Sequence, residues 1–232
     1  MNAELRSFFE DVIENFSNHF KESHNKPFTT QTVDSCISIY DLCLFYEPEN
    51  IVEIGTNHGA STISILKALK NLGKNNAPFT SIDLSHKAWE EVGTIQKQLV
   101  EDLSWESVIT ITDDFNQVDP ISVNLGEKLF LFYDMHDHTG PWSLRLLTQW
   151  LPHMKNALIA IHDFSRVDDS YIVKSTEIQP KTKMKYLNGQ TYAGFLEVGR
   201  IIKWANTNRI KINNFNGGIY FFIKNGTVEI LE

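Results

Sequence analysis

Acidic residues stand at or just beside the ends of five apolar runs in this sequence. They are Glu53, Asp83, Asp113 with Asp114, Asp134 and Asp163. A single aspartate after a strand commonly caps the next helix, but acids at five such ends exceed what capping explains. Because the carboxyl ends of parallel strands meet at one edge of a sheet, and ligands bind at that edge, these acids predict a polar binding site there.

A turn with two glycines follows the first apolar run. The segment reads Ile51-Val52-Glu53-Ile54-Gly55-Thr56-Asn57-His58-Gly59-Ala60-Ser61 and leads into a helical pattern. Gly55 permits backbone angles closed to other residues, and Gly59 permits the backbone to approach a ligand closely. The first N–H groups of the following helix, and the positive end of its dipole, attract an anionic group. The turn therefore predicts a pocket for a nucleotide-type ligand.

Asp83 narrows the choice of ligand. It lies 28 positions after Gly55, at the end of the second apolar run, where an acid accepts hydrogen bonds from two ribose hydroxyls. Both a dinucleotide and an adenosyl compound carry such a ribose. A dinucleotide-binding turn has the spacing G-x-G-x-x-G, and the turn from Gly55 to Gly59 lacks the middle glycine. Glu53 suits a ligand with an ammonium group, or else it orients the turn by accepting backbone N–H bonds.

Alternating patterns of strand and helix must position these residues. The alternation predicts an α/β fold with a doubly wound, mostly parallel Rossmann-like sheet. Two amphipathic helices precede the sheet, and two strands around an Asn/Gly turn form an antiparallel C-terminal edge pair. The predicted strands are 51–54, 78–83, 108–112, 129–133, 157–161, 210–212 and 218–223. The predicted helices are 3–22, 31–46, 60–72, 86–102, 141–153 and 195–204.

A single domain, 1–232, accommodates these elements, because no repeat, low-complexity tract or linker interrupts the chain. Its parts are the N-terminal helices (1–48), a cofactor-binding core (49–165), a substrate loop or lid (165–193) and a C-terminal helix with edge strands (194–232). The lid is predicted because a long irregular insert in a compact domain is usually functional or disordered. The N-terminal helices carry enough apolar surface to support a homo-oligomer or to cover their own sheet.

The composition argues against several classes of protein. Of 232 residues, 42% are hydrophobic and 22% are charged, as in soluble globular proteins. The net charge of −8 argues against a general affinity for nucleic acid or an anionic membrane, because both need clustered positive charge. No apolar run reaches about 18 residues and no signal peptide is evident, which predicts a cytoplasmic protein. Cys36 and Cys43 fit buried apolar positions in a reducing compartment.

The first motif, Val52-Glu53-Ile54-Gly55-x-x-x-Gly59-x-Ser61, resembles that of class I S-adenosylmethionine (SAM)-dependent methyltransferases. The resemblance is greatest to catechol-type O-methyltransferases and to the cephalosporin-hydroxylase-like family. It implies that the turn holds the methionine part of SAM, through Glu53, Gly55, Thr56, Asn57, Gly59 and Ser61. It also implies that Asp83 binds the ribose and that Asp113 or Asp114 reads the adenine.

The fourth and fifth strand ends resemble the same family. They read Asp134-Met-His136-Asp-His138 and Ile161-His162-Asp163-Phe164. The resemblance implies that Asp134 and Asp163 bind Mg²⁺ or another divalent cation, which takes oxygen ligands and aligns the acceptor. Phe164 stands where a third oxygen ligand is expected, so His162 is the substitute, and a histidine favours a softer ion. The open alternative is that these acids position the substrate by hydrogen bonds.

His136 and His138 are the candidate general bases, together with Asp134, because histidine titrates near neutral pH. Two residues apart in a loop, they need not point the same way, and one of them is expected to be a solvated loop residue.

The leading hypothesis is a methyltransferase that uses SAM to methylate an oxygen of a small hydroxylated acceptor, such as a sugar or a natural product. One alternative is an NAD-type oxidoreductase, although the glycine spacing and a Tyr-x-x-x-Lys pair for hydride transfer are missing. The other is a non-catalytic binding module on the same fold, since a fold does not fix a function.

Overall fold

The computed structural model describes residues 3–24, 32–56, 59–84, 102–104, 107–115, 117–134, 142–162, 192–215 and 219–226. Two predicted elements lie almost entirely outside these residues. They are the helix at 86–102, of which only the last position is described, and the lid at 165–193, of which only the last two positions are described.

The described strands form one seven-stranded sheet with the order β3-β2-β1-β4-β5-β7-β6. Five of its strands run parallel, and β7 pairs antiparallel with both β5 and β6 at the C-terminal edge. The parallel strands are β1 (Asn50–Ile54), β2 (Phe79–Asp83), β3 (Ile109–Thr112), β4 (Lys128–Tyr133) and β5 (Asn156–His162). The edge pair consists of β6 (Asn213–Phe215) and β7 (Ile219–Asn225). The predicted mostly parallel sheet with an antiparallel edge pair is confirmed.

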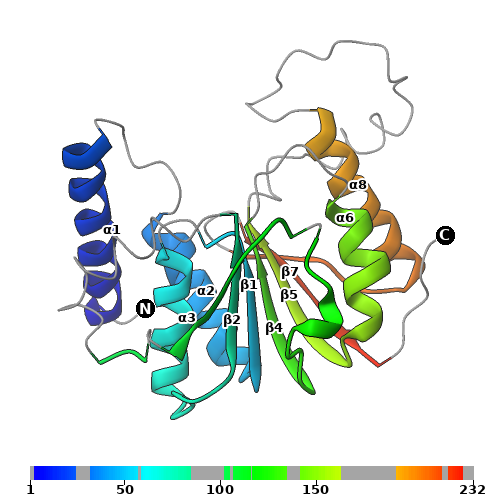
Figure 1. Ribbon diagram of the computed structural model, residues 1–232, viewed down its shortest axis with the longest axis horizontal. Coiled ribbons are helices and arrows are strands. Elements are labelled where there is room, and N and C mark those ends of the chain that lie inside the picture. Colours follow the sequence, from blue (N-terminus) through cyan, green and yellow to red (C-terminus); the bar gives the residue numbers. More distant parts are fainter. Residues whose placement is uncertain are drawn as a thin grey trace.

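Helices cover both faces of the sheet, as a doubly wound fold requires (Figure 1). On one side lie α2 (Val33–Tyr46) and α3 (Ala60–Asn71), with α1 (Ala3–His24) packed outside them against α2. On the other side lie α6 (Trp142–Arg145) and α8 (Tyr192–Thr207). A short 3-10 turn, η2 (Pro120–Ser122), precedes β4. No helix among the described residues is long and apolar enough to span a membrane.

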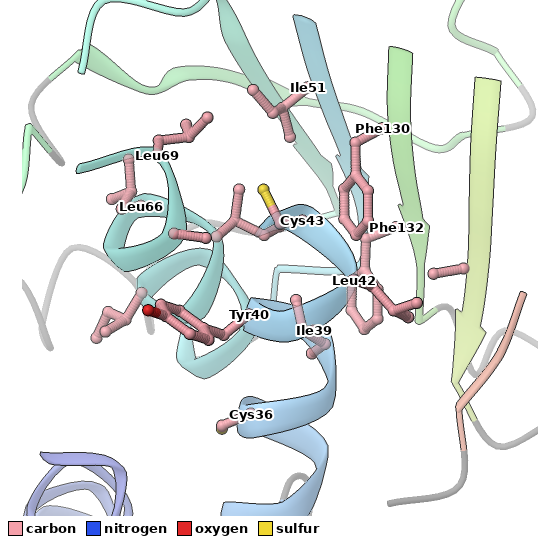
Figure 2. Close-up of a cluster of buried hydrophobic side chains, with 14 of the residues drawn as sticks. Cys36, Ile39, Tyr40, Leu42, Cys43, Ile51, Leu66, Leu69, Phe130 and Phe132 are labelled. Carbon is pink, nitrogen blue, oxygen red and sulfur yellow. The ribbon is translucent and has the colours of Figure 1, made fainter. Parts of the chain in front are cut away.

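Helix α2 packs its apolar side chains against α3 and the sheet (Figure 2). The labelled residues come from α2 (Cys36, Ile39, Tyr40, Leu42, Cys43), α3 (Leu66, Leu69), β1 (Ile51) and β4 (Phe130, Phe132). Both cysteines are fully buried, and burial raises the pKa of each thiol to about 12. The helix begins at Val33 because the Thr32 hydroxyl accepts a hydrogen bond from the Ser35 N–H at 3.1 Å. Of the two roles predicted for the N-terminal helices, the structure shows α2 covering its own sheet.

The segment after α6 departs from a regular α-helix. The sequence predicts one helix over 141–153, and the structure divides it into α6, a π-helical turn η3 (Leu146–Trp150) and a 3-10 turn η4 (Leu151–His153). Pro152 has no N–H group to donate, and the turn that contains it is closed instead by a hydrogen bond from the Met154 N–H to Leu151 O at 3.2 Å. The π turn places the fully buried Trp150 in the core on the α6 side.

The first strand of the C-terminal pair begins three residues later than predicted, at Asn213 instead of Ile210. The end of α8 explains the difference. Arg209 adopts a left-handed conformation with φ 56°, and the Ile210 N–H donates to the carbonyl oxygen of Ala205 at 2.8 Å. Residue 210 therefore closes the helix. The alternating Ile210 and Ile212 side chains pack against the core cluster instead of belonging to a strand.

Lys224 joins β7 to the residues that precede β5. Its side chain is 2% exposed overall, and its Nζ donates to the carbonyl oxygens of Met154, Lys155 and Gly226. We expect Lys224→Met to lower the free energy of unfolding by about 2 kcal/mol, because these buried acceptors lose their donor. Urea denaturation measures this change.

The adjacent Lys155→Met is the matched control. Lys155 forms an exposed ion pair with Glu127, so its loss should cost below about 0.5 kcal/mol. Equal stability of the two variants would contradict the structural role of Lys224.

Candidate functional site

The carboxyl ends of the central strands are joined by backbone hydrogen bonds that continue past the strands. The Gly55 N–H donates to Ile82 O at 2.9 Å, and the Asp134 N–H donates to Ile54 O at 2.8 Å. The Asp113 N–H donates to Asp83 O at 3.0 Å. The described acids of the sequence analysis therefore lie along one edge of the sheet.

Alternation along the strands places three of these acids and His162 on the same face. Ile51, Phe79, Phe132 and Ala160 belong to the core cluster beneath α2 and α3. Side chains two residues apart in a strand share a face. Continuing by that period leads to the four polar residues of this edge, which are Glu53, Asp83, Asp134 and His162.

The glycine turn has the backbone conformation that the sequence predicts. Gly55 and Gly59 have φ values of 87° and 84°, where other residues are strained. The Thr56 hydroxyl is buried and hydrogen-bonded to the hydroxyl of Ser81 on β2, so Thr56 can offer a ligand its backbone rather than its hydroxyl. The turn leads directly into α3 at Ala60. Asn57 lies outside the described residues.

Glu53 is a fully buried acid between the sheet and the first turn of α3. The Thr62 hydroxyl donates to Oε2 at 2.6 Å, whereas no donor among the described residues meets Oε1 in good hydrogen-bond geometry. Burial raises the pKa of Glu53 to about 7. Hydrogen bonding from Ser61 and Thr62 opposes this rise, and the charges of Asp83 and Asp134 add to it.

The surroundings of Glu53 therefore favour a cation as a ligand. A buried carboxylate with one unsatisfied oxygen and two neighbouring acids is costly unless positive charge is supplied. Ser61 is 1% exposed, and its hydroxyl interacts with the Glu53 carboxyl within the core.

Asp134 and His162 form a buried pair at the ends of β4 and β5. Their side chains are 8% and 6% exposed, and His162 Nδ1 lies 3.1 Å from Asp134 Oδ1. A carboxylate beside Nδ1 favours the tautomer that carries its proton there, which leaves Nε2 as the basic ring nitrogen. The pair follows from the register, because Tyr133 is paired with Ile161 and the next residues are Asp134 and His162.

The hydrogen bond between the two residues was not predicted from the sequence, which assigned both as ligands of the same metal ion. The sequence shows only that each residue stands at the end of an apolar run; that these two runs are neighbouring strands is shown by the structure. Asp163, His136 and His138 lie outside the described residues. Within the described part of the chain, no group of three His, Cys, Asp or Glu side chains is placed to hold a metal ion.

Asp113 and Asp114 occupy a turn after β3. Asp113 Oδ1 accepts a hydrogen bond from the Asp114 N–H at 2.7 Å, and Asp114 O accepts one from the Gln117 N–H at 2.7 Å. Phe115 anchors the turn in the core with 1% of its surface exposed. The backbone bond described above places the turn directly beside Asp83.

The central part of this chain is similar in sequence to a known protein family, and its fold is similar to solved structures. Residues 52–164 match a family model described as a methyltransferase domain. No curated protein matches the chain in sequence. The structure is similar to the O-methyltransferase TomG from Streptomyces achromogenes in complex with SAM, with 14% identity and a TM-score of 0.61 over 96% of each chain.

Two further solved structures are similar. One is an O-methyltransferase from Bacillus cereus in complex with S-adenosylhomocysteine (SAH), at 16% identity and a TM-score of 0.57, covering 94% of this chain and 91% of that one. The other is the SAH-bound methyltransferase PaMTH1 from Podospora anserina, at 15% identity and a TM-score of 0.57, covering 98% and 89%. The solved structures show that this chain shares their fold, and residues 52–164 within that fold match the methyltransferase domain model.

Glu53 makes the stability of the ligand-free protein depend on pH. Its folded pKa of about 7 exceeds the ordinary value of 4.5, so between these pH values the folded state retains a proton that the unfolded state releases. Its contribution to stability therefore falls as pH rises from about 4.5 to 7, by on the order of 3 kcal/mol. We expect Glu53→Gln to remove this decline and to be more stable than the wild type at pH 8.

Urea denaturation at a series of pH values from 5 to 8 measures this difference. Glu10→Gln, which changes an exposed glutamate of α1, is the control and should follow the wild-type profile. Parallel pH profiles for the wild type and Glu53→Gln would show that the buried carboxyl does not titrate in this range.

Proposed function

We propose that this chain, in which residues 52–164 match a methyltransferase domain, uses SAM to methylate an oxygen of a small hydroxylated acceptor. The observation that carries the proposal is the buried Glu53 beside a positive-φ glycine turn, which offers negative charge to one part of a ligand and helix N–H groups to another. SAM has the matching groups, since its methionine part carries both an ammonium and a carboxylate.

Each part of the cofactor has a candidate partner on this edge. Glu53 pairs with the ammonium, and the backbone from Gly55 to Gly59, with the start of α3, receives the carboxylate. Asp83 at the end of β2 accepts the ribose hydroxyls. Asp113 and Asp114 stand beside it to receive the adenine. When bound, SAM supplies an electrophilic methyl group on a sulfonium centre.

The buried Asp134–His162 pair supplies the candidate for proton removal. Asp134 holds the proton of His162 on Nδ1 and stabilises the ring when it becomes charged, as a carboxylate does beside a catalytic histidine. Nε2 then takes the proton of the acceptor hydroxyl as the methyl group is transferred. His136 and His138, in the segment after Asp134, are the alternative bases.

A divalent cation is the second role for the same residues. A histidine whose other ring nitrogen bonds a carboxylate is a common metal ligand, so the geometry of His162 also suits a metal site. Asp134 and His162 are two of the three predicted ligands, and Asp163 would complete the set. Within the described part of the chain no three such side chains are placed to hold a metal ion, and Asp163 lies outside that part.

A natural product or a sugar is the proposed acceptor class. The similar structure TomG is described as involved in tomaymycin synthesis, which is support for the former. Screening purified protein with SAM against hydroxylated acceptors, with SAH release as the readout, identifies the acceptor. The same screen addresses the non-catalytic alternative, because a binding module releases no SAH with any acceptor.

The affinity for SAH should depend on pH through Glu53. Only the ionised carboxylate pairs with the ammonium, and with a pKa of about 7 its ionised fraction rises about tenfold between pH 6 and pH 8. We expect the wild type to bind SAH up to about tenfold more tightly at pH 8 than at pH 6, and Glu53→Gln to bind weakly with a flat profile. Isothermal titration calorimetry measures both.

Glu10→Gln again serves as the control and should retain the wild-type affinity at both pH values. An absence of wild-type binding at millimolar SAH would refute the proposed function. Tight, pH-dependent binding by Glu53→Gln would assign the ammonium to another residue.

His162→Asn should slow methyl transfer while leaving SAH binding intact. Loss of a general base lowers kcat by about 10²–10⁴-fold, whereas asparagine keeps a side-chain donor for Asp134. The exposed His153→Asn in η4 is the matched control and should retain full activity. Steady-state kinetics with the acceptor found by screening measures kcat.

Comparison with His136→Ala and His138→Ala locates the base. If one of these variants loses turnover and His162→Asn does not, the base lies in the 135–141 segment. Assays with EDTA, followed by addition of Mg²⁺ or Mn²⁺, distinguish the two roles of the pair. Activity that is lost with EDTA and restored by the metal favours metal assistance, and activity that EDTA leaves unchanged favours direct proton removal by His162.

A further inference from the structure

Arg145 connects helix α6 to the turn that follows β3. Its Nε donates to the carbonyl oxygen of Phe115 at 3.0 Å, and its Nη2 donates to that of Val118 at 2.9 Å. Both bonds join residues about thirty positions apart in the chain and from different elements. The side chain therefore sets where the turn lies relative to α6.

The ring of Phe115 strengthens this connection. The Arg145 guanidinium carbon lies 5.8 Å from the centre of the ring, within the range of a cation–π contact. The Phe115 ring also packs against two other aromatic rings. Its centre lies 5.5 Å from that of Tyr133 on β4 and 5.0 Å from that of Trp150 in the π turn. Phe115 is thus held between β4, the π turn and Arg145.

The backbone of the turn leaves little freedom to Asp113 and Asp114. Asp114 O accepts hydrogen bonds from the N–H groups of Gln117 and Val118, at 2.7 Å and 3.3 Å. The two carbonyls to which Arg145 donates, those of Phe115 and Val118, point to α6 instead. The position of the two acids is therefore fixed on one side by β2 and β3 and on the other by Arg145.

An arginine is needed for this geometry. Its planar guanidinium presents donors in a fixed fork, which can serve two separate carbonyl oxygens at once and also stack on an aromatic ring. A lysine is a single point of charge on a flexible stem and cannot reproduce both bonds with the ring contact.

We propose that Arg145 is a positioning residue for the nucleoside end of the cofactor. It holds Phe115 and Val118 so that Asp113 and Asp114 meet the adenosine, and it makes the affinity for that end depend on the placement of α6. The proposal rests on the proposed function, because it assigns the two acids to SAM. It also links the cofactor pocket to the helix that follows the 135–141 segment, where the candidate bases His136 and His138 lie.

Adenosine and SAH are the probes that test this role. We expect Arg145→Met to weaken both ligands by a similar factor of about tenfold, because only the shared nucleoside end loses its support. Arg145→Lys should weaken the two ligands by about as much as Arg145→Met does, since lysine cannot make both hydrogen bonds. Glu53→Gln is the opposite control, and it should weaken SAH but leave adenosine unchanged. Calorimetry for SAH and competition between SAH and adenosine measure these affinities.

A double-mutant cycle separates positioning from a general loss of stability. If Arg145 acts through the two acids, Arg145→Met should weaken SAH binding by less than about twofold in a variant in which Asp113 and Asp114 are already alanine. In the intact background it should raise the KM for SAM with little change in kcat. Thermal unfolding of every variant, with Arg6→Met on α1 as a surface control, checks that each is folded at the assay temperature.

Two results would overturn the positioning role. One is a variant Arg145→Met or Arg145→Lys that is less stable yet binds SAH like the wild type. The other is a full, multiplicative effect of Arg145→Met in the alanine background. If the wild type itself binds neither SAH nor adenosine, the proposed function fails and the role of Arg145 fails with it. If the wild type binds both ligands and one of the two results above is found, only the role of Arg145 fails. The two failures are therefore distinguishable.

Discussion

The burial of one negative charge organises the ligand-binding edge of this protein. Glu53 lies in the interior strand β1 and is covered by the first turn of α3, with only hydroxyl groups as its hydrogen-bonding partners among the described residues. Removing a carboxylate from water is unfavourable unless a cation compensates it, and two further acids nearby make the field more negative. The folded protein thus carries an electrostatic cost that a cationic ligand relieves. Such a site favours ligand binding and lowers the stability of the ligand-free protein.

The glycine turn and the strand register give this charge its surroundings. The turn needs positive φ at Gly55 and Gly59, which brings α3 close enough for Thr62 to reach Glu53. Parallel pairing then places Asp83 on one side and Asp134 on the other, because each lies one step from a residue paired with β1. The same rule, continued to β5, brings His162 to Asp134. The proposed proton acceptor, His162, and the acid proposed to bind the ammonium group, Glu53, are therefore positioned by one sheet, on one of its faces.

Much of this arrangement follows from the sequence, and the exceptions have physical causes. The central strands, the first helices and the acids at the strand ends follow from apolar periodicity and the two glycines. The Asp134–His162 bond forms because β4 and β5 are neighbours in the sheet. The order of strands along the chain does not give their order in the sheet. The late start of β6 depends on how α8 ends at Arg209, a tertiary effect on residues whose alternation favours a strand. The broken helix after Trp142 likewise depends on packing Trp150 in the core. Arg145 gives no signal in the sequence, since its role consists of bonds to backbone groups of a distant turn.

The position of β7 has a consequence for how the site comes into being during synthesis. This strand is inserted between β5 and β6 and pairs along the whole length of β5, from Asn156 to His162. It leaves the ribosome only after the entire 163–218 interval has been made, and until then β5 has an open edge. The nascent chain can form the cofactor side of the sheet, around β1 and β2, while the strand that carries His162 still lacks one neighbour. The proposed cofactor binding and the proposed proton removal by His162 should therefore arise at different moments of translation, the second only when β7 has joined.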